Sequence, residues 1–250
     1  MKIVDDYHTH TLFSHGINSI EENIKYAIDN GMSTIAITDH GPAYKPYGID
    51  IKEFDKINSQ VDFLKEKYKN QVNILLGIEA NIINENGDLD ISESIINKLD
   101  ILLVGFHFDI IDVSYLSEVR SLLKRHEGIE KYIDKDLYNH IKDVNTKAMI
   151  NSIKKHNIDI ITHINDKFPV DVLCIGKACA KYNTAIEINN FHRHPNISEI
   201  KLLNEIDNLK FSFGSDAHRS KDVGNFKNIQ RKIVNINMCY ENIINKIIQK

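Results

Sequence analysis

The stretch TIAITDH, residues 34–40, sets the pattern from which the fold is predicted. It is a short apolar run, typical of a strand covered on both faces, and it ends on the polar residues Asp39 and His40. The same pattern returns along the chain. Strands are predicted at 3–8, 34–38, 72–78, 101–104, 158–161, 184–188 and 210–213.

Helical segments are predicted between these strands. In 19–30, Ser19 and Glu22 match a capping box, isoleucines at every fourth position form one apolar stripe, and Gly31 ends the helix. Further helices are predicted at 145–156, 170–182 and 240–249. About seven strands that alternate with helices indicate a parallel sheet, either a closed β/α barrel or an open doubly wound sheet. The barrel is favoured because polar residues follow one strand after another.

The polar residues at the predicted strand ends are mostly histidines, of which the chain has 12. These residues are His8, His10, His15, Asp39, His40, Glu79, His107, His163, Asp216 and His218. Since the carboxyl ends of parallel barrel strands form one rim, their side chains should converge. Burying so many titratable groups is unfavourable unless they are paired or bind metal, and imidazole and carboxylate groups bind Zn²⁺, Fe²⁺ and Mn²⁺. The sequence therefore predicts a multinuclear metal site.

Spacing adds detail at two of these strand ends. His8 and His10 flank one residue, so in an extended strand both point to the same face. Asp216 and His218 have the same spacing. Gly214, just upstream, is predicted to let the backbone approach the site closely.

Composition limits the other classes of function. The chain is 42% hydrophobic and 26% charged, and its net charge of −4 argues against a basic surface for nucleic acid or anionic membrane. No apolar run approaches the ~20 residues that span a bilayer, so a cytoplasmic protein is predicted. The 3 cysteines lack a C-x-x-C motif, which argues against a disulfide framework and a thiolate zinc site. Cys174 and Cys179 are predicted to be buried helix residues.

Six motifs occur in order over residues 5–230. They are HTH at 8–10, ITDHGP at 37–42, GIEANI at 77–82, GFH at 105–107, TH at 162–163 and GSDAH at 214–218. This ordered set closely resembles the PHP (polymerase and histidinol phosphatase) family. NGDLDI at 86–91, NTKAMI at 145–150 and AIEINN at 185–190 resemble its YcdX-type phosphatase branch in particular.

The resemblance implies one PHP domain over residues 1–250 with the fold of a distorted seven-stranded TIM-like (β/α)7 barrel. It also implies three divalent metal ions, with zinc as the expected metal and manganese or iron as alternatives. The implied ligands are His8, His10, Glu79 and Asp216 for one ion, Glu79, His107 and His163 for a second, and His15, His40 and His218 for a third. Asp39 is expected to orient a ligand histidine. The segment after His107 is longer than in this branch and is expected to carry an extra helix beside the barrel mouth.

Charge favours phosphoester hydrolysis. Three divalent ions with Glu79 and Asp216 leave about four positive charges, which suit a phosphomonoester dianion better than a neutral amide. A hydroxide activated by the centre would attack phosphorus in line, and no G-x-S-x-G nucleophile motif is present. Arg193 and Arg219 are candidates for a phosphate clamp, with plain surface positions as the alternative.

The remaining histidines are interpreted separately. Three lie on or beside charged helical stretches and are predicted at the surface: His126, His140 and His156. His192 and His194 belong to NNFHRHPN, residues 189–196, a loop that either contacts substrate or is solvated.

The predicted function is a metal-dependent hydrolase of small phosphomonoesters. One alternative is a histidinol-phosphate phosphatase of histidine biosynthesis, which shares the metal set. A PHP-type nuclease or phosphodiesterase is disfavoured by the acidic balance and the lack of a companion domain. An inactive binding domain is disfavoured because every implied ligand is present. The substrate, the physiological metal and the oligomeric state stay open.

Overall fold

Seven parallel strands form one sheet whose order in space follows the order along the chain, from β2 to β8. The computed structural model describes residues 2–108, 134–166 and 168–248. A parallel bridge between Thr9 and Ala217 joins the segments that follow the two edge strands, so the sheet is nearly closed. The predicted β/α barrel with a TIM-like arrangement is confirmed, and the open doubly wound sheet is excluded.

The elements alternate as expected for this fold. The barrel strands are β2 (Asp5–Asp6), β3 (Thr34–Ile37), β4 (Asn73–Asn81), β5 (Ile101–Gly105), β6 (Ile160–Ile161), β7 (Ala185–Asn189) and β8 (Lys210–Gly214). The α-helices are α1 (Ile20–Asp29), α2 (Phe54–Tyr68), α3 (Glu93–Ile96), α5 (Lys135–Lys155), α6 (Val172–Tyr182), α7 (Ile197–Asn204) and α8 (Lys227–Ile233). Short 3-10 helices are η1 (Ile51–Glu53), η3 (Ser220–Asp222) and η4 (Tyr240–Asn242).

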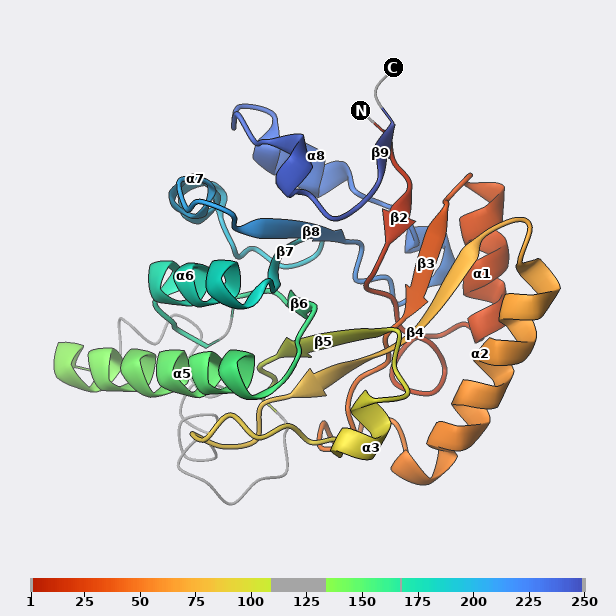
Figure 1. Ribbon diagram of the computed structural model, residues 1–250, viewed down its shortest axis with the longest axis horizontal. Coiled ribbons are helices and arrows are strands. Elements are labelled where there is room, and N and C mark those ends of the chain that lie inside the picture. The colour runs from red at the N-terminus through yellow and green to blue at the C-terminus, as the bar shows by residue number, and fades with distance from the viewer. Residues whose placement is uncertain (1, 109–133, 167, 249–250) are drawn as a thin grey trace.

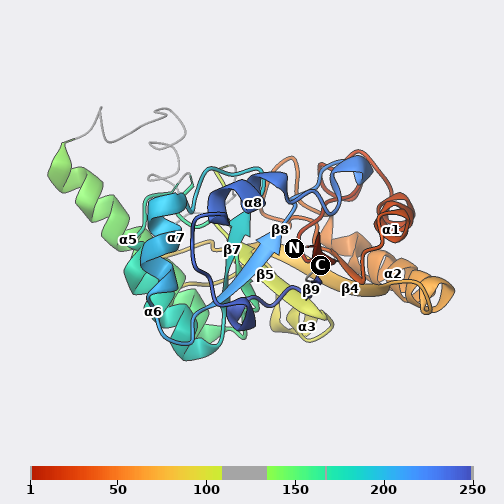
Figure 2. The ribbon, with the colours of Figure 1, turned by 90° about the horizontal axis from the view of Figure 1, so that it is seen from above.

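The helices lie outside the barrel. In both views α1 and α2 cover one side and α5, α6 and α7 the other (Figures 1 and 2). The start of α1 follows from its sequence, because the Ser19 side chain accepts from the Glu22 backbone and the Glu22 side chain accepts from the Ser19 backbone. No helix within the described ranges is long and apolar enough to cross a membrane.

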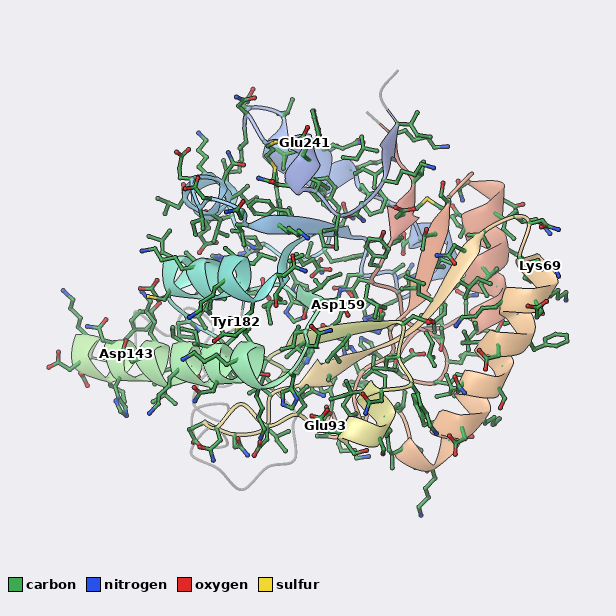
Figure 3. The ribbon with its side chains drawn as sticks, viewed as in Figure 1. Lys69, Glu93, Asp143, Asp159, Tyr182 and Glu241 are labelled. Carbon is green, nitrogen blue, oxygen red and sulfur yellow. The ribbon has the colours of Figure 1, made fainter. Side chains whose placement is uncertain are left out.

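Alternation along each strand separates the outside of the barrel from its inside. In β4, Ile78 and Ala80 join the large core shared with the helices, so Glu79 and Asn81 point inward. A small inner cluster, with no helix residue in it, consists of Ala36, Ile101, Leu103, Ile160 and Ala185. Figure 3 shows side chains filling the space between the strands. Asp159, labelled there, marks the N-terminal start of β6. The inside is therefore apolar toward the N-terminal ends of the strands and polar toward their C-terminal ends.

The C-terminal segment is not the predicted helix. Over the described residues 240–248 only η4 is helical, and β9 (Ile247–Ile248) pairs antiparallel with β1 (Lys2–Ile3), next to both chain ends in Figure 1. Between them the buried Asn245 side chain bonds the backbone N–H and C=O of Phe213 and the C=O of Asp5. Asn245 thereby links the two edge strands of the barrel, a long-range role that local periodicity does not reveal. The β-branched isoleucines of this segment suit an extended chain.

Two other predictions need correction, and one cannot be compared. Cys179 is buried as predicted, but Cys174 is exposed, because it lies on the outer side of the first turns of α6. The helix predicted at 145–156 begins earlier, at Lys135, where Asp134 caps it. The helix expected after His107 falls largely on 109–133, outside the described residues, as does His126.

Candidate metal centre

Glu79 lies at the middle of the histidine cluster. Its Oε2 is 2.7 Å from His40 Nδ1, 3.3 Å from His8 Nε2 and 3.7 Å from His10 Nε2. Its Oε1 is 2.8 Å from His163 Nε2 and 3.6 Å from His107 Nε2. The side chain is fully buried, and its two oxygens face two different groups of histidines.

A second group of rings lies on the solvent side of His10. His15 and His218 have ring centroids 4.0 Å apart, and the His15 and His40 rings stack at 4.7 Å. The centroid of the His10 ring lies 4.3 Å from that of His40 and 4.5 Å from that of His218. The implied third set of ligands is therefore brought together by the loop after β2, the end of β3 and the loop after β8.

Asp216 closes the cluster from the β8 side. Its Oδ1 is 3.2 Å from His10 Nε2 and 3.7 Å from His8 Nε2. Both Asp216 and His163 have positive φ angles, 55° and 27°, a conformation that L-residues rarely adopt and that is common at functional sites. The backbone turns sharply at these two strand ends so that the side chains point into the barrel mouth.

The residues present fit divalent ions. Buried His10 Nδ1, His15 Nδ1 and His218 Nε2 have no hydrogen-bond partner among the described residues, although buried polar atoms are nearly always satisfied. Three groups bring ligand atoms within 4.8 Å of one another: His10, His40 and His218; His8, His10 and Glu79; and His40, Glu79 and His107. Nitrogen and carboxylate ligands at this density match zinc, iron or manganese.

Electrostatics put three proposed ligands, His15, His40 and Glu79, in their binding forms. Burial lowers the pKa of His40 to about 3, and burial together with His218 and His10 lowers the pKa of His15 to about 3, so both rings are neutral at pH 7. Burial raises the pKa of Glu79, but nearby histidines, His8 above all, outweigh it and hold that pKa well below its usual value. Neutral imidazoles and an ionised carboxylate are the forms that bind a divalent ion. Burial lowers the pKa of His8, but the carboxylates around it outweigh burial and raise that pKa well above its usual value, so this ring must lose a proton when an ion binds.

Hydrogen bonds from behind orient two of the histidines. His107 Nδ1 lies 2.6 Å from Asn81 Oδ1, and Asn81 in turn donates to Asp90 Oδ2 at 2.6 Å. Asp90 belongs to the NGDLDI motif, which thus reaches the site through Asn81. His8 Nδ1 lies 2.7 Å from Glu187 Oε1. Such partners fix the ring orientation and tautomer of a metal-binding histidine.

Glu187 is a functional candidate that the sequence interpretation missed. It is buried, and its other oxygen accepts the His163 backbone N–H at 3.0 Å. A Cβ at Gly214 would collide with Glu187 Oε1, so the close approach predicted for Gly214 is made to this carboxylate. A signal was present: AIEIN at 185–189 repeats the pattern of GIEAN at 77–81, with both glutamates pointing inward.

Asp39 is close to the site but has a different role from the predicted one. Its carboxylate accepts from Thr11 N at 2.7 Å, Thr11 Oγ1 at 2.6 Å and Ser14 Oγ at 2.5 Å. It therefore fixes the loop that carries His15, and it bonds no histidine ring among the residues that the structure describes.

The two histidines of the 189–196 loop point in different directions, His192 toward the histidine cluster and His194 toward α7. His192 reaches the cluster, with Nε2 3.3 Å from Asp216 Oδ2 and Nδ1 2.8 Å from Asp166 Oδ2. Burial lowers its pKa, but these two hydrogen bonds outweigh it and raise the pKa to about 10. His194, the other candidate of this loop for a catalytic contact with substrate, lies with Nδ1 2.7 Å from Oε2 of Glu199, which caps α7. The identity of the histidine that points inward depends on the loop backbone, which spacing alone does not fix.

The other predicted residues lie at the surface, with one exception. Arg193 and Arg219 are exposed, and neither side chain forms an ion pair within the described part of the chain. His140 is exposed as predicted. The surface prediction for His156 is wrong, because its side chain is only 6% exposed and pairs with Glu93 at 3.0 Å.

Glu187→Gln should weaken metal binding by about tenfold to a hundredfold, since the carboxylate that orients His8 loses its charge. Competition with a fluorescent zinc chelator would measure this change. Glu205→Gln, at the exposed end of α7, is the matched control and should bind metal like the unaltered protein. Unchanged affinity in Glu187→Gln would show that Glu187 acts only in folding.

A β/α barrel with a cluster of histidines and carboxylates at the C-terminal ends of its strands has the architecture of barrel metalloenzymes. The model of the PHP domain family matches residues 6–191, and the chain belongs to this family. A protein of Tolumonas auensis is 34% identical, and the alignment covers 98% of this chain and 91% of the relative. A protein of Caldanaerobacter subterraneus is 35% identical, and the alignment covers 100% of this chain and 90% of the relative. Both are described as "probable phosphatase".

A solved structure shares the fold. Histidinol phosphate phosphatase of Lactococcus lactis, complexed with zinc, L-histidinol and phosphate, has a TM-score of 0.63 and 15% identity over 96% of this chain and 95% of its own. At this identity the likeness shows the fold alone. Together with the family, the relatives confirm the prediction of an enzyme, a phosphatase of the PHP family.

Proposed function

We propose that the chain is a phosphomonoester hydrolase with three divalent ions, zinc being the expected metal. The proposed ligands are His8, His10, His15, His40, Glu79, His107, His163, Asp216 and His218. The observation that carries the proposal is the position of Glu79, whose two oxygens face His8, His10 and His40 on one side and His107 and His163 on the other. A carboxylate placed in this way suits a bridge between two ions. Ions held there would supply an activated water near neutral pH and positive charge for phosphate oxygens.

The charge of the site suits a dianionic substrate. Glu187 adds a third carboxylate to Glu79 and Asp216, and Asp166 balances the charge of His192, so three divalent ions leave about three positive charges where the sequence alone indicated four. This excess still favours a phosphate dianion over a neutral amide. Arg193 and Arg219, exposed beside the site residues His192 and His218, are the proposed clamp for outer phosphate oxygens.

The protein residues orient the reacting groups. Asp39 holds the His15 loop, Asn81 and Glu187 hold two histidines, and the positively charged His192 fixes the outer oxygen of Asp216. These contacts let the site form before substrate arrives, so little reorganisation is needed during reaction. No protein nucleophile is required.

A panel of substrates would test this proposal. Purified protein supplied with zinc, manganese or iron should hydrolyse 4-nitrophenyl phosphate and at least one phosphorylated metabolite. Histidinol phosphate tests the second candidate, which the sequence left open. A short oligonucleotide tests the nuclease alternative. Hydrolysis of the diester with no hydrolysis of any monoester would contradict the proposal.

A further inference from the structure

A cavity of about 270 Å³ lies at the N-terminal ends of the barrel strands, at the end of the barrel opposite the histidine cluster. Residues at or near the starts of β4 to β8 line it, together with residues that follow β2 and precede β9. Its apolar lining consists of Tyr7, Leu75, Ile101, Ala185 and Ile244. We call this space the lower cavity.

Small residues in the barrel help to create the lower cavity. The interior of a β/α barrel is usually filled by layers of bulky branched side chains. The small inner cluster that borders this end contains two alanines, Ala36 and Ala185, beside its isoleucines and its leucine. An unfilled space loses packing contacts for the side chains around it, so the stability of the barrel does not explain the lower cavity.

Two of the three charged side chains that line the lower cavity lack an opposite charge. Asp100 is already paired, because its Oδ2 lies 2.6 Å from Lys65 Nζ. Asp159 Oδ2 accepts the Leu102 backbone N–H at 2.8 Å, and burial outweighs this bond and raises the pKa of Asp159. Within residues 2–108, 134–166 and 168–248, neither Asp159 nor Lys210 forms an ion pair. The lower cavity therefore presents one unpaired negative charge and one unpaired positive charge.

Strand register keeps these two charges apart. Lys210 pairs with Ala185 and Ala185 pairs with Ile160 in neighbouring strands, and Asp159 directly precedes Ile160. Asp159, labelled in Figure 3, thus lies two strands from Lys210 at the same end of the barrel, so roughly 10 Å separate their backbones. A small molecule that contacts both side chains would neutralise both charges.

We propose that the lower cavity binds a small zwitterion with an apolar body, the chemistry of a free amino acid with an apolar side chain. The carboxylate of the ligand pairs with Lys210, its ammonium group pairs with Asp159, and its body contacts the apolar lining. A cavity of about 150 Å³ holds benzene, so the larger lower cavity has room for a phenyl ring and the two charged groups. Apolar walls with a few polar groups are typical of small-molecule sites.

L-Phenylalanine is the probe that tests the proposal, and a ligand-observed NMR titration would measure its affinity. Saturable binding is expected. 3-Phenylpropanoate lacks the ammonium group and phenethylamine lacks the carboxylate, so each should bind about tenfold more weakly or worse. Lys210→Gln should weaken L-phenylalanine and 3-phenylpropanoate by about tenfold or more but leave phenethylamine unchanged. Asp159→Asn should weaken L-phenylalanine and phenethylamine and leave 3-phenylpropanoate unchanged.

Three further variants locate the binding. Lys201→Gln, at an exposed position of α7, is the matched control and should bind L-phenylalanine like the unaltered protein. Since an amino acid can also coordinate a metal ion, Glu79→Gln separates the two ends of the barrel, and binding in the lower cavity should persist in it. Ala185→Leu fills the space from its wall and should abolish binding. Thermal unfolding would show whether each variant folds, and Lys210→Gln decides where Ala185→Leu does not.

Three results would overturn the proposal. They are the absence of saturable binding of L-phenylalanine at millimolar concentration, affinity that is unchanged in both Lys210→Gln and Asp159→Asn, and loss of binding in folded Glu79→Gln protein. Each result leaves the phosphatase function intact, because the lower cavity and the histidine cluster lie at opposite ends of the strands. Conversely, a failure to hydrolyse any phosphomonoester would not affect the binding measured here.

Discussion

Replacing Glu79 with glutamine is expected to lower the hydrolysis of 4-nitrophenyl phosphate by at least about a thousandfold, or about 4 kcal/mol of transition-state stabilisation. Glutamine keeps the size of the side chain but removes the charge that the surrounding histidines hold in place. Because each oxygen of Glu79 faces a different group of proposed ligands, the substitution should weaken the binding of two ions rather than of a single ion. Steady-state kinetics and the metal content of the same preparation would measure both effects.

The fold should survive this substitution. Circular dichroism and thermal unfolding in the presence of chelator would show whether Glu79→Gln keeps the barrel. Glu66→Gln is the matched control, because Glu66 is 79% exposed on α2 and should change neither metal nor rate. Near-normal activity of a folded Glu79→Gln protein would mean that Glu79 has only a structural role.

His15→Ala and His163→Ala are expected to lose metal and activity together, by about a hundredfold or more in rate, since each removes a proposed ligand. The two residues represent different parts of the cluster. His163 lies 2.8 Å from Glu79 Oε1, whereas His15 lies in the outer group with His218. Separate zinc titrations of the two variants should therefore lose different ions.

Controls for these variants come from histidines outside the cluster. His140→Ala, on the exposed face of α5, should alter neither metal nor rate and should shift stability by less than about 0.5 kcal/mol. His194→Ala should keep metal and activity but should lower the melting temperature, because it removes the partner of Glu199 at the start of α7. Loss of metal in His194→Ala would mean that the ligand assignment is wrong.

The convergence of the site could be predicted from the sequence because one rule governs it. Each strand of a parallel barrel ends at the same rim, so His8, His40, Glu79, His107 and Asp216 meet whatever lies between them in the chain. The inward direction of Glu79 likewise follows from strand alternation, as the outward Ile78 and Ala80 show. These features depend on local periodicity and on topology, both of which the sequence carries.

Features that depend on long-range contacts could not be read in this way. The segment 240–249 has an apolar pattern that also fits a helix, but Asn245 is needed between the two barrel edges, and the chain is extended there. The 189–196 loop has two histidines, and only the folded backbone brings His192 to Asp216 and His194 to Glu199. The inward position of Glu187 could have been predicted, because the sequence of its strand repeats the pattern around Glu79. The role of Glu187 could not, because it depends on the contact with His8, which forms only in the folded protein.

The proposed three-ion centre is tested most directly by the metal content of the protein as purified without chelator. Elemental analysis by inductively coupled plasma mass spectrometry, divided by the protein concentration from amino-acid analysis, should give about two to three transition-metal ions per chain, with zinc the most abundant. Fewer than about one ion per chain, in protein that stays metal-poor after incubation with zinc, manganese and iron, would contradict the centre proposed for these residues.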